Sequence, residues 1–276
     1  MRNTENLDDW DAFEQWLHKR YEEHRGFKKD PNSGYVSDLL FRGQSNANWT
    51  LTTTLERYAV QKPKLLGAGD YYQRIHAAKP QIETYTGKHW EIDDPLQYYK
   101  RLKDSSFFHN RFAGKIYEYM VFLRHHGFPS PLLDWSRSPY VAAFFAFRDA
   151  PFEEGCVAVY SFLEHAGKGK FARGGSPKIS GLGPNVASHK RHFIQQSQYT
   201  VCTQDTDDEF MYRSHQTAFE NSETGQDILW KMTLPTKQRL EILRILDLHN
   251  INSLSLFGSD EGLMETVALR ELMIRE

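Results

Sequence analysis

Cysteine is scarce in this sequence, and neither sign of charge prevails. Cys156 and Cys202 are too few for a disulfide framework or a four-cysteine zinc site, and they suit a reducing compartment. The 34 Lys and Arg residues nearly balance the 36 Asp and Glu residues, so the formal net charge is −2. This balance excludes a globally basic nucleic-acid-binding protein, but it leaves room for a local basic groove.

Long apolar runs are also missing. No window approaches 18 consecutive apolar residues, so the sequence predicts no membrane-spanning helix. Residues 1–26 are charged throughout and lack the apolar core of a signal peptide. We therefore expect a soluble, cytoplasmic protein that does not associate with membranes.

Aromatic residues, by contrast, are plentiful, with 18 Phe, 14 Tyr and 6 Trp. An aromatic core explains them better than a dedicated stacking surface. The 276 residues allow one large domain or two small ones and suffice for a sizeable core. Because nothing resembles an interdomain linker, we expect one α+β domain.

Local patterns predict helices and strands along most of the chain. Helical spacing predicts helices at Asp8–His24, Phe112–His126, Pro139–Phe147, Thr236–Asn250 and Asp260–Glu276. Apolar or β-branched runs predict strands at Tyr35–Gly43, Cys156–Leu163, Phe193–Thr203 and Ile228–Pro235, and a short strand or turn at Ile251–Phe257. Residues 26–34, 164–192 and 205–227 are expected as loops, and residues 58–115 show mixed patterns.

Capping residues support several of these boundaries. Asp8 and Thr236 are expected to cap the helices that follow them, and Gly127 to end the helix before it. Ser138 is placed to cap a helix that has Pro139 in its first position. That helix is apolar on nearly every side, so we expect it to be buried under a sheet.

Common catalytic motifs are absent. There is no P-loop, no H-E-x-x-H and no G-x-S-x-G, and the glycines at 181 and 183 lack the third glycine of a dinucleotide fingerprint. His125 and His126 are adjacent, so on a helix they point about 100° apart and do not form an i, i+4 ligand pair. A helix C-terminus, where the dipole favours imidazole, explains them better than metal binding.

The first notable motif is Phe41-Arg42-Gly43-Gln44-Ser45, at the end of a predicted strand. Arginine there offers a fixed fork of donors that suits phosphate. The glycine beside it would let a ligand approach the backbone. The alternative is a structural salt bridge followed by a turn glycine.

A second motif runs from Leu132 to Pro139. The Ser136 and Ser138 hydroxyls and a capped helix N-terminus would make a surface that favours anions. Asp134 needs partners if it is buried, and Arg42 or backbone N–H groups would serve. The alternative is ordinary capping by Ser138 and structural pairing by Asp134.

A third motif runs from Arg191 to Tyr199 and contains Gln195, Gln196 and Gln198. These glutamines could bond a ribose, an amide or a base as they enter a strand. The alternative is the polar edge of a strand.

Together these motifs resemble the FRG domain family, named for its F/Y-R-G motif. The resemblance rests on the three motifs, on Leu123-Arg124-His125-His126-Gly127-Phe128-Pro129 and on the closing Leu256-Phe257 and Glu261-Gly262-Leu263. It covers roughly residues 35–265, so we expect an FRG domain at 35–276, with the helix and loop of residues 1–34 packed on it. The chain departs from the family at Ser130-Pro131 and at Ser197, where the family usually has Thr-Arg and glycine.

The Arg-Gly motif is also distantly similar to the first motif of the arginine-class ADP-ribosyltransferases. That resemblance implies a central mixed or antiparallel sheet flanked by helices, with NAD as cofactor and Arg42 organising its phosphates. Gly43, Gln44, Asp134, Ser136, Ser138, Gln195 and Gln196 would complete the binding site. The third motif of those enzymes carries a glutamate, but Gln198 stands at the comparable place here and would take the catalytic position together with Arg42. A glutamine lacks the charge that stabilises an oxocarbenium-like transition state.

The first functional hypothesis is therefore an ADP-ribosyltransferase-like effector, a toxin or phage-defence protein, that modifies a protein or a nucleic acid. The second is a non-catalytic module that binds a nucleotide or nucleic acid through the basic 168–191 segment. Trp135, Phe171 or Tyr199 would then stack on bases. The third is a metal-dependent hydrolase or nuclease that uses Asp134, Glu118 and His125 or His126, although these residues lack a recognised metal-ligand spacing.

Overall fold

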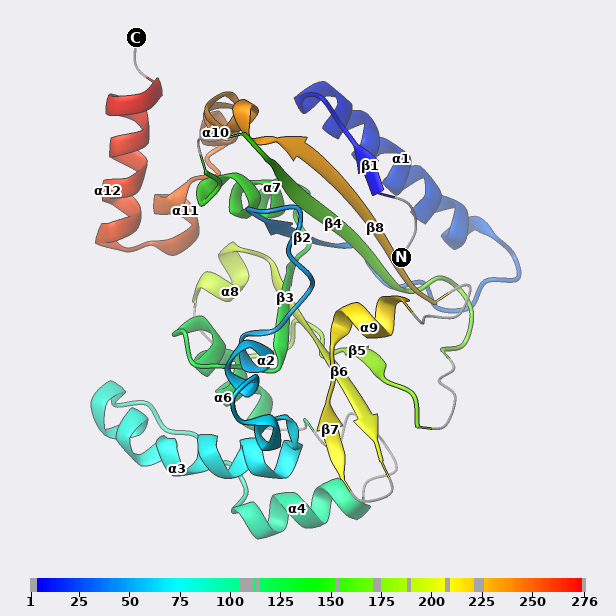
Figure 1. Cartoon of the computed structure of the whole chain (residues 1–276), viewed down its shortest axis with the longest axis vertical. Coiled ribbons are helices and arrows are strands. Elements are labelled where there is room, and N and C mark those ends of the chain that lie inside the picture. Colours follow the sequence, from blue (N-terminus) through cyan, green and yellow to red (C-terminus); the bar gives the residue numbers. More distant parts are fainter. Residues whose placement is uncertain are drawn as a thin grey trace.

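One mixed, open sheet runs through the whole molecule (Figure 1). The computed structural model describes residues 4–104, 112, 115–151, 154–170, 175–187, 190–206, 209–220 and 226–274. In this part of the chain the strand order is β1-β8-β4-β2-β3-β6-β5, and β7 also pairs with β6. The β1–β8 pairing is parallel and the other pairings are antiparallel. The expected α+β architecture, a mixed sheet flanked by helices, is confirmed.

The strands and helices have the following bounds. The strands are β1 (Thr4–Asn6), β2 (Leu40–Gln44), β3 (Leu132–Ser136), β4 (Cys156–His165), β5 (Lys178–Gly181), β6 (Ser197–Asp205), β7 (Phe210–Tyr212) and β8 (Gln226–Pro235). The helices are α1 (Trp10–Lys29), α2 (Thr54–Ala59), α3 (Ala68–Thr86), α4 (Pro95–Asp104), α6 (Lys115–His125), α7 (Pro139–Arg148), α8 (Lys190–Ile194), α9 (His215–Glu220), α10 (Arg239–Leu248), α11 (Ser253–Phe257) and α12 (Asp260–Ala268). Shorter helical turns are η1 (Pro63–Leu66), η2 (Thr236–Gln238) and η3 (Leu269–Ile274).

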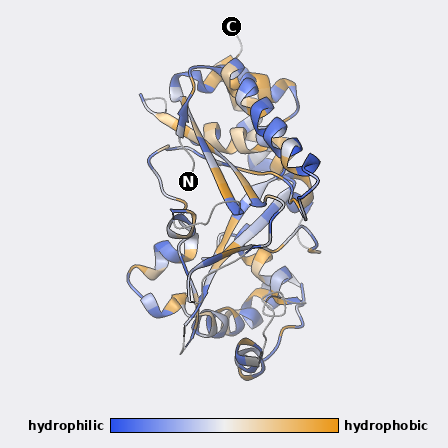
Figure 2. Cartoon of the chain, turned by 90° about the vertical axis from the view of Figure 1, so that its right-hand side faces the viewer, coloured by the Kyte–Doolittle hydropathy of each residue, from blue (hydrophilic) through white to orange (hydrophobic). Residues whose placement is uncertain are grey.

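The sheet supports two lobes with separate cores. In the first lobe, α1, α7 and α10 bury one face of β2, β4 and β8. In the second lobe, α3, α4 and α6 bury β3, β6 and β7 with a cluster rich in tyrosine. A third cluster, which includes residues of α9, covers the opposite face of the central strands. Figure 2 shows the apolar residues concentrated on the central strands and the helices packed against them.

The two lobes meet where β2 and β3 separate. These strands share one paired position, Phe41 opposite Ser136, whereas β2 pairs with β4 along its whole length from Leu40 to Gln44. Beyond Phe41, therefore, β2 leaves β3, and the sheet opens beside Arg42. The functional motif predicted from the sequence lies at this opening.

Gly43 is fixed by helix packing at the same place. A Cβ atom on Gly43 would lie 1.9 Å from the Ala142 carbonyl oxygen and 2.6 Å from the Ala146 nitrogen, both in α7. The expectation that α7 is buried under a sheet is confirmed, with Ser138 as its cap and Pro139 as its first residue. The sequence analysis explained Gly43 by the close approach of a ligand to the backbone. In the structure, the close packing of α7 on β2 also requires glycine at this position.

Several predicted element boundaries were wrong. The first helix is capped by Asp9 rather than Asp8 and runs past Gly26 to Lys29. Thr236 does not cap α10, because its hydroxyl donates to the Gly155 carbonyl. The chain at Ile251–Phe257 contains helix α11, capped by Asn252, and not a strand.

Other segments contain elements that the sequence patterns missed. The expected loop at 164–192 includes β5 and the start of α8, and the predicted strand at 193–203 begins only at Ser197. The expected loop at 205–227 contains β7 and α9, and residues 58–115 contain α3 and α4. In the described residues no helix combines the length and apolarity needed to span a membrane.

Replacing Gly43 with alanine should be severely destabilising. The added methyl group would overlap backbone atoms of α7, which cannot move without displacing that helix from the core, so we expect a loss of at least several kcal/mol on the scale of steric overpacking. Thermal unfolding of purified Gly43→Ala would measure it.

Gly26→Ala is the matched control, because a Cβ there meets nothing within 4 Å and the residue lies inside α1. This variant should gain about 0.5–1 kcal/mol, as expected for Gly to Ala in a helix. A Gly43→Ala protein as stable as the parent would show that α7 does not pack as closely as described.

Candidate functional site

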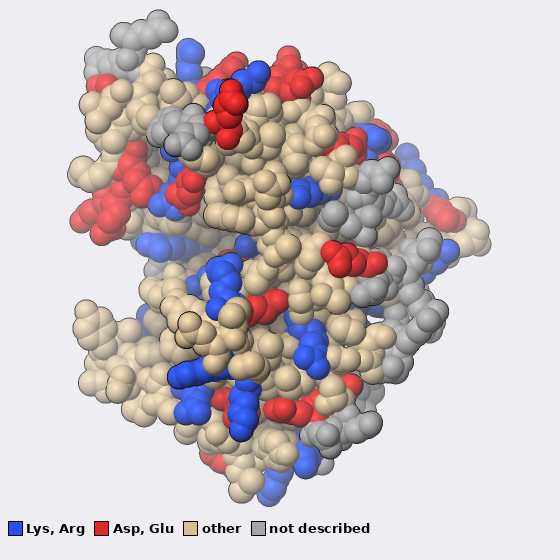
Figure 3. All heavy atoms as spheres, viewed as in Figure 1, with Lys and Arg blue, Asp and Glu red and all other residues tan. Residues whose placement is uncertain are grey.

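A cleft of about 960 Å³ opens between the two lobes at the point where β2 and β3 separate. Its described lining comes from five regions: Phe41–Ser45 of β2 and beyond; Asn48, Trp49, Thr50, Thr52 and Arg57; Arg124, His125, Asp134, Trp135 and Ser136; Ala142, Phe145, Arg148 and Asp149; and Arg191, Gln195, Ser197, Tyr199 and Phe257. Figure 3 shows a hollow between the lobes at the left of the molecule, with basic side chains at its back.

The described lining of the cleft carries more basic than acidic side chains, although the chain as a whole does not. Five arginines but only two aspartates belong to its described lining: Arg42, Arg57, Arg124, Arg148, Arg191, Asp134 and Asp149. Lysine is absent from the same lining. Planar guanidinium groups suit bidentate contacts with phosphate or carboxylate, so the cleft favours an anionic ligand.

Arg42 spans the opening of the sheet. Its Nη1 donates to the backbone carbonyl of Asp134 at 2.7 Å, which links β2 to β3 beyond their last paired residues. Its Nε is buried and has no hydrogen-bond partner among the described residues. Burial lowers the pKa of Arg42 from 12.5 to about 10; Asp134 opposes the shift, and Arg124 and Arg57 add to it. The guanidinium stays protonated at neutral pH and retains an unused donor.

The Asp134 carboxylate pairs with Arg124 and not with Arg42. Arg124 Nε lies 3.1 Å from Oδ1 and its Nη2 lies 2.6 Å from Oδ2, so the contact is bidentate. The sequence interpretation had offered Arg42 or backbone N–H groups as partners of this carboxylate, and that part was wrong. Arg42 holds the carbonyl of the same residue, so two arginines from different elements fix Asp134 at the centre of the cleft.

Gln44 also carries an unused polar atom. Its Nε2 donates to the Thr50 carbonyl at 3.2 Å, while its buried Oε1 has no partner in the described chain. The side chain is only 7% exposed. Together with Arg42 Nε it makes one unpaired donor and one unpaired acceptor at the cleft, an arrangement that a ligand hydroxyl or phosphate would satisfy.

The side chains of Ser136, Ser138 and Gln195 form hydrogen bonds with backbone groups of the protein. Ser136 lines the cleft, but its hydroxyl donates to the Gln195 carbonyl at 2.8 Å and accepts the Ser138 N–H at 3.0 Å. Ser138 lies outside the described lining and accepts the Val141 N–H as the cap of α7. The Gln195 side chain donates to the Leu256 carbonyl at 3.0 Å. Ser138 therefore caps a helix, as the structural alternative in the sequence analysis proposed.

Gln196 and Gln198 also lie outside the cleft lining. Gln196 is exposed, with a left-handed φ of 49°, in the turn that precedes β6. Side chains alternate along a strand, so the face of β6 that places Ser197 and Tyr199 in the cleft turns Gln198 to the opposite face. Catalysis by Gln198 thus finds no geometric support here.

Tyr199 connects the cleft to a chain of imidazoles. His192 Nε2 lies 3.0 Å from the Pro184 carbonyl, which can only accept, so this nitrogen carries the proton and Nδ1 accepts from Tyr199. The Tyr199 oxygen then accepts from His125 Nε2 at 2.7 Å. Burial raises the pKa of Tyr199 well above its ordinary value and lowers that of His192. The phenol is neutral at physiological pH.

The C-terminal helices close one side of the cleft, where Phe257 of the closing Leu256-Phe257 motif belongs to the lining. Arg191 Nε donates to the Phe257 carbonyl at 3.0 Å, and both Arg191 and Arg148 lie over the Phe257 ring. Arg148 is neutralised by Glu265 through contacts of 2.8 and 3.0 Å. Helix α8 of the second lobe is therefore tied to α11 of the first.

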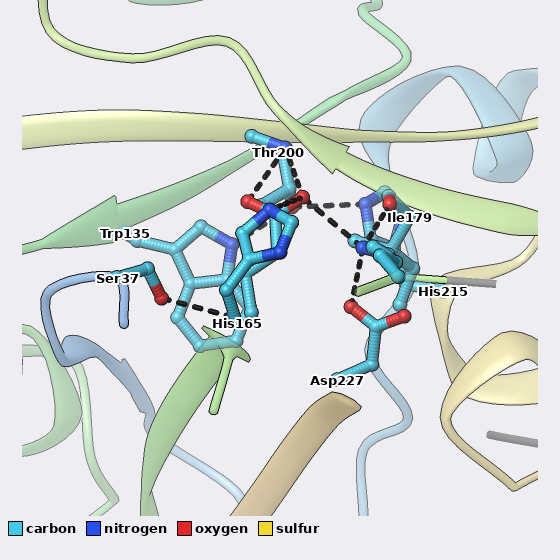
Figure 4. A network of polar contacts seen from close by, with 10 residues as sticks. Ser37, Trp135, His165, Ile179, Thr200, His215 and Asp227 are labelled. Atoms are coloured by element: carbon cyan, nitrogen blue, oxygen red, sulfur yellow. Dashed lines mark hydrogen bonds and ion pairs between the residues drawn. The ribbon is translucent and has the colours of Figure 1, made fainter. Parts of the chain in front are cut away.

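A buried network of ionisable groups lies behind the cleft, and Figure 4 shows it converging from several strands. Lys170 contacts Glu164 at 3.0 Å, Asp227 at 2.6 Å and the Ile179 carbonyl at 2.5 Å. Burial raises the pKa of Asp227 to about 6, with Lys170 opposing and Glu164 adding to the shift.

A neutral histidine lies in the same region. Thr200 Oγ1 accepts from Trp135 Nε1 at 2.9 Å and is 3.0 Å from His215 Nε2. Burial lowers the pKa of His215 to about 3, reinforced by the positive charges of Arg42 and Lys170 and opposed by the Thr200 contact. Arg42 of the cleft lining is thus close enough to His215 to lower the pKa of that histidine.

These positions bear on the two other functional hypotheses. Trp135 and Tyr199 are 2% and 1% exposed, so their rings cannot stack on bases of a nucleic acid as proposed. Lys170 is buried in the network above, and Phe171 lies outside the described residues. Glu118 pairs with Lys115, and the described residues contain no group of three or more His, Cys, Asp or Glu side chains placed to hold a metal.

Comparison with known families agrees with the motif at the opening of the sheet. Residues 37–154, which include β2, β3 and α7, match the FRG domain family. The chain contains an FRG domain. Neither curated proteins nor solved structures include a match to this chain. The family match thus includes both Arg42 and Asp134 of the cleft. The domain boundary expected between residues 34 and 35 stays a prediction.

Two buried groups, Asp227 and His215, should change the stability of the FRG-domain protein in opposite directions as the pH falls. Asp227, with a raised pKa, takes up a proton on folding between about pH 6 and 4, so it adds stability as the pH falls. His215, with a lowered pKa, gives up a proton on folding below about pH 6.5, so its stabilisation is lost as the pH falls. Each effect is on the order of 2 kcal/mol between pH 6.5 and 4.5.

Urea denaturation at these two pH values would separate the contributions. Asp227→Asn should lose more stability than the parent on acidification, and His215→Gln should lose less. The reverse order of the two variants, or identical pH profiles, would show that these groups do not titrate as described.

Ser138→Ala should lower the free energy of unfolding, measured by urea denaturation, by about 1 kcal/mol, because the helix cap is lost. Ser259→Ala is the matched control: it removes the cap of α12, with the same 3.3 Å bond length, away from the cleft. A Ser138 variant as stable as the parent would show that this hydroxyl does not cap α7.

Proposed function

We propose that the cleft binds NAD and that the FRG-domain protein is an ADP-ribosyltransferase-like enzyme. The observation that carries this proposal is Arg42, a charged and partly buried arginine with an unpaired Nε at the opening of the sheet. Two further arginines, Arg57 and Arg124, are near enough to lower its pKa. A pyrophosphate supplies the negative charge and the acceptor oxygens that such a group requires.

The dimensions and polar atoms of the cleft fit a dinucleotide. A volume of about 960 Å³ lies at the upper end of the range for ligand pockets. Gln44 Oε1 can accept from a ribose hydroxyl, and Arg42 Nε can donate to a phosphate oxygen. Each contact would satisfy a buried polar atom that the described protein leaves unpaired.

The proposed reaction breaks the bond between ribose C1′ and the ring nitrogen of nicotinamide. The electron pair returns to nicotinamide, which leaves neutral, and a nucleophilic atom of the acceptor bonds to C1′ and releases its proton. A carboxylate is required to stabilise the positive charge on the ribose. Asp134 and Asp149 are the carboxylates in the described lining, and Asp134 is the less exposed of the two. We therefore assign this role to Asp134.

A second candidate function is nucleotide binding without cleavage. The bidentate contact with Arg124 compensates the charge of Asp134, which would weaken its effect on a cationic ribose. Arg42 and Gln44 would bind the nucleotide in the same manner in both cases. Release of nicotinamide distinguishes the two functions.

Calorimetric titration with NAD tests the binding site. Arg42→Ala should weaken binding at least tenfold, as expected for the loss of charge-assisted hydrogen bonds. Arg239→Ala is the matched control, because Arg239 is also a partly buried arginine bonded to backbone carbonyls but lies outside the cleft lining. Thermal unfolding of each variant would establish that it is folded.

Arg42→Lys keeps the charge but loses the planar fork, so it should bind with intermediate affinity. Nicotinamide release, followed chromatographically in the same samples, would identify an enzyme and should be abolished in Asp134→Asn. A folded Arg42→Ala protein that binds NAD as tightly as the parent would refute the proposed site.

A further inference from the structure

Exposed aromatic and basic side chains gather beside the cleft, on the segment from Ser45 to Gly67. Trp49 is 57% exposed and Tyr58 is 64% exposed. Three exposed cations, Arg57, Lys62 and Lys64, lie on α2 and the turn that follows it. We refer to these five residues as the aromatic-basic strip.

The strip begins inside the cleft and continues away from it. Trp49 and Arg57 belong to the cleft lining, whereas Tyr58, Lys62 and Lys64 lie beyond it. Figure 3 shows further basic side chains on the lower lobe below the hollow, in the region where Figure 1 draws α2. A chain-like ligand lying on the strip would therefore have one end at the proposed NAD site.

The backbone under the strip is held by several hydrogen bonds. The Trp49 N–H donates to the Asn46 carbonyl at 3.2 Å, and the Thr50 carbonyl accepts from Gln44 at 3.2 Å. Thr53 and Glu56 form a reciprocal capping box at the start of α2. The Trp49 ring is thus exposed on an ordered backbone and belongs to the lining of the cleft.

The segment from Ser45 to Gly67 carries more basic than acidic side chains. Ser45–Gly67 contains Arg57, Lys62 and Lys64 but only one acid, Glu56, whose carboxylate accepts the Thr53 N–H. No ion pair joins the three cations to any other described residue. On α1, by contrast, exposed cations such as Lys19 are paired with acids. The excess positive charge is local, because the whole chain carries −2.

We propose that the aromatic-basic strip binds a single-stranded nucleic acid and presents it to the cleft as the ADP-ribosyl acceptor, an inference that rests on the proposed function. Aromatic rings stack on the bases of any sequence, and cations beside them follow the phosphate backbone. A duplex hides its base faces, whereas a single strand offers them to both rings.

In the proposed transfer step, the single-stranded nucleic acid is the nucleophile and NAD supplies the ADP-ribosyl group. An oxygen or ring nitrogen of the strand forms the new bond to ribose C1′ while the bond from C1′ to nicotinamide breaks. Nicotinamide departs with the bonding electron pair, and the proton of the nucleophile passes to water. No oxidant or reductant is required.

Fluorescence anisotropy with labelled oligouridine and oligothymidine tests the binding surface. The parent should bind either probe, with a log affinity that falls with log salt at a slope of about −2 for three cations. Tyr58→Ala should weaken binding roughly tenfold through the loss of one stacking platform. The double variant Lys62→Ala/Lys64→Ala should reduce the size of the slope by about 1.4.

Matched controls lie elsewhere on the surface. Tyr85→Ala removes a tyrosine that is 93% exposed on α3, and Lys29→Ala/Lys237→Ala removes two exposed lysines from the first lobe. Both controls should bind the probes as the parent does. Parent-like binding by the Tyr58 and Lys62/Lys64 variants, or no binding by the parent, would overturn the strip as a nucleic-acid site.

Titration with NAD on the same variants separates this inference from the proposed function. Tyr58, Lys62 and Lys64 lie outside the cleft, so their variants should bind NAD as the parent does. NAD binding without oligonucleotide binding would overturn the inference alone. Oligonucleotide binding without NAD binding would overturn the acceptor role together with the proposed function. Label from NAD that appears on protein and never on the oligonucleotide would also overturn the acceptor role.

Discussion

The hydrogen bond from Arg42 to the Asp134 carbonyl joins the two lobes where the sheet no longer does. Strands β2 and β3 are paired at one position and then diverge, and the guanidinium occupies the space between them. A smaller or uncharged side chain would leave that carbonyl unpaired and the gap unfilled. The same placement partly buries Arg42 and leaves Nε without a described partner, so one side chain supports the scaffold and keeps an unused donor.

Most side chains of the motifs that identify the FRG domain make contacts within the protein that hold its helices and strands in place. Gly43 admits α7, Ser136 bonds the chain before β6, and Ser138 caps α7. Each of these contacts aligns an element that borders the opening of the sheet. The unpaired donor and acceptor belong to Arg42 and Gln44, which lie on either side of that glycine. A five-residue motif can therefore specify a packing arrangement and also place unpaired polar atoms at the cleft.

The sequence was sufficient for elements with strong local signals. Ser138-Pro139 and the apolar run of α7 predicted a buried, capped helix, and β4 and β8 are apolar enough to be recognised alone. The site was harder to predict, because Arg57, Arg124, Arg148 and Arg191 come together only through the tertiary fold. Gln198 lies outside the cleft lining for a local reason: a shift of one residue in a strand turns the side chain to the other face. Short elements such as α11 depend on a cap and tertiary contacts, which composition does not reveal.

The carbonyls of Leu256 and Phe257 have a mechanical consequence for the cleft. They accept from Gln195 and Arg191 of the opposite lobe, on the side away from the β2–β3 contact. The lobes are thus fastened at two separate places, and main-chain atoms take part in both fastenings. Contacts on both sides of the cleft restrain a motion that would separate its walls. Widening the cleft would therefore require breaking hydrogen bonds at both places.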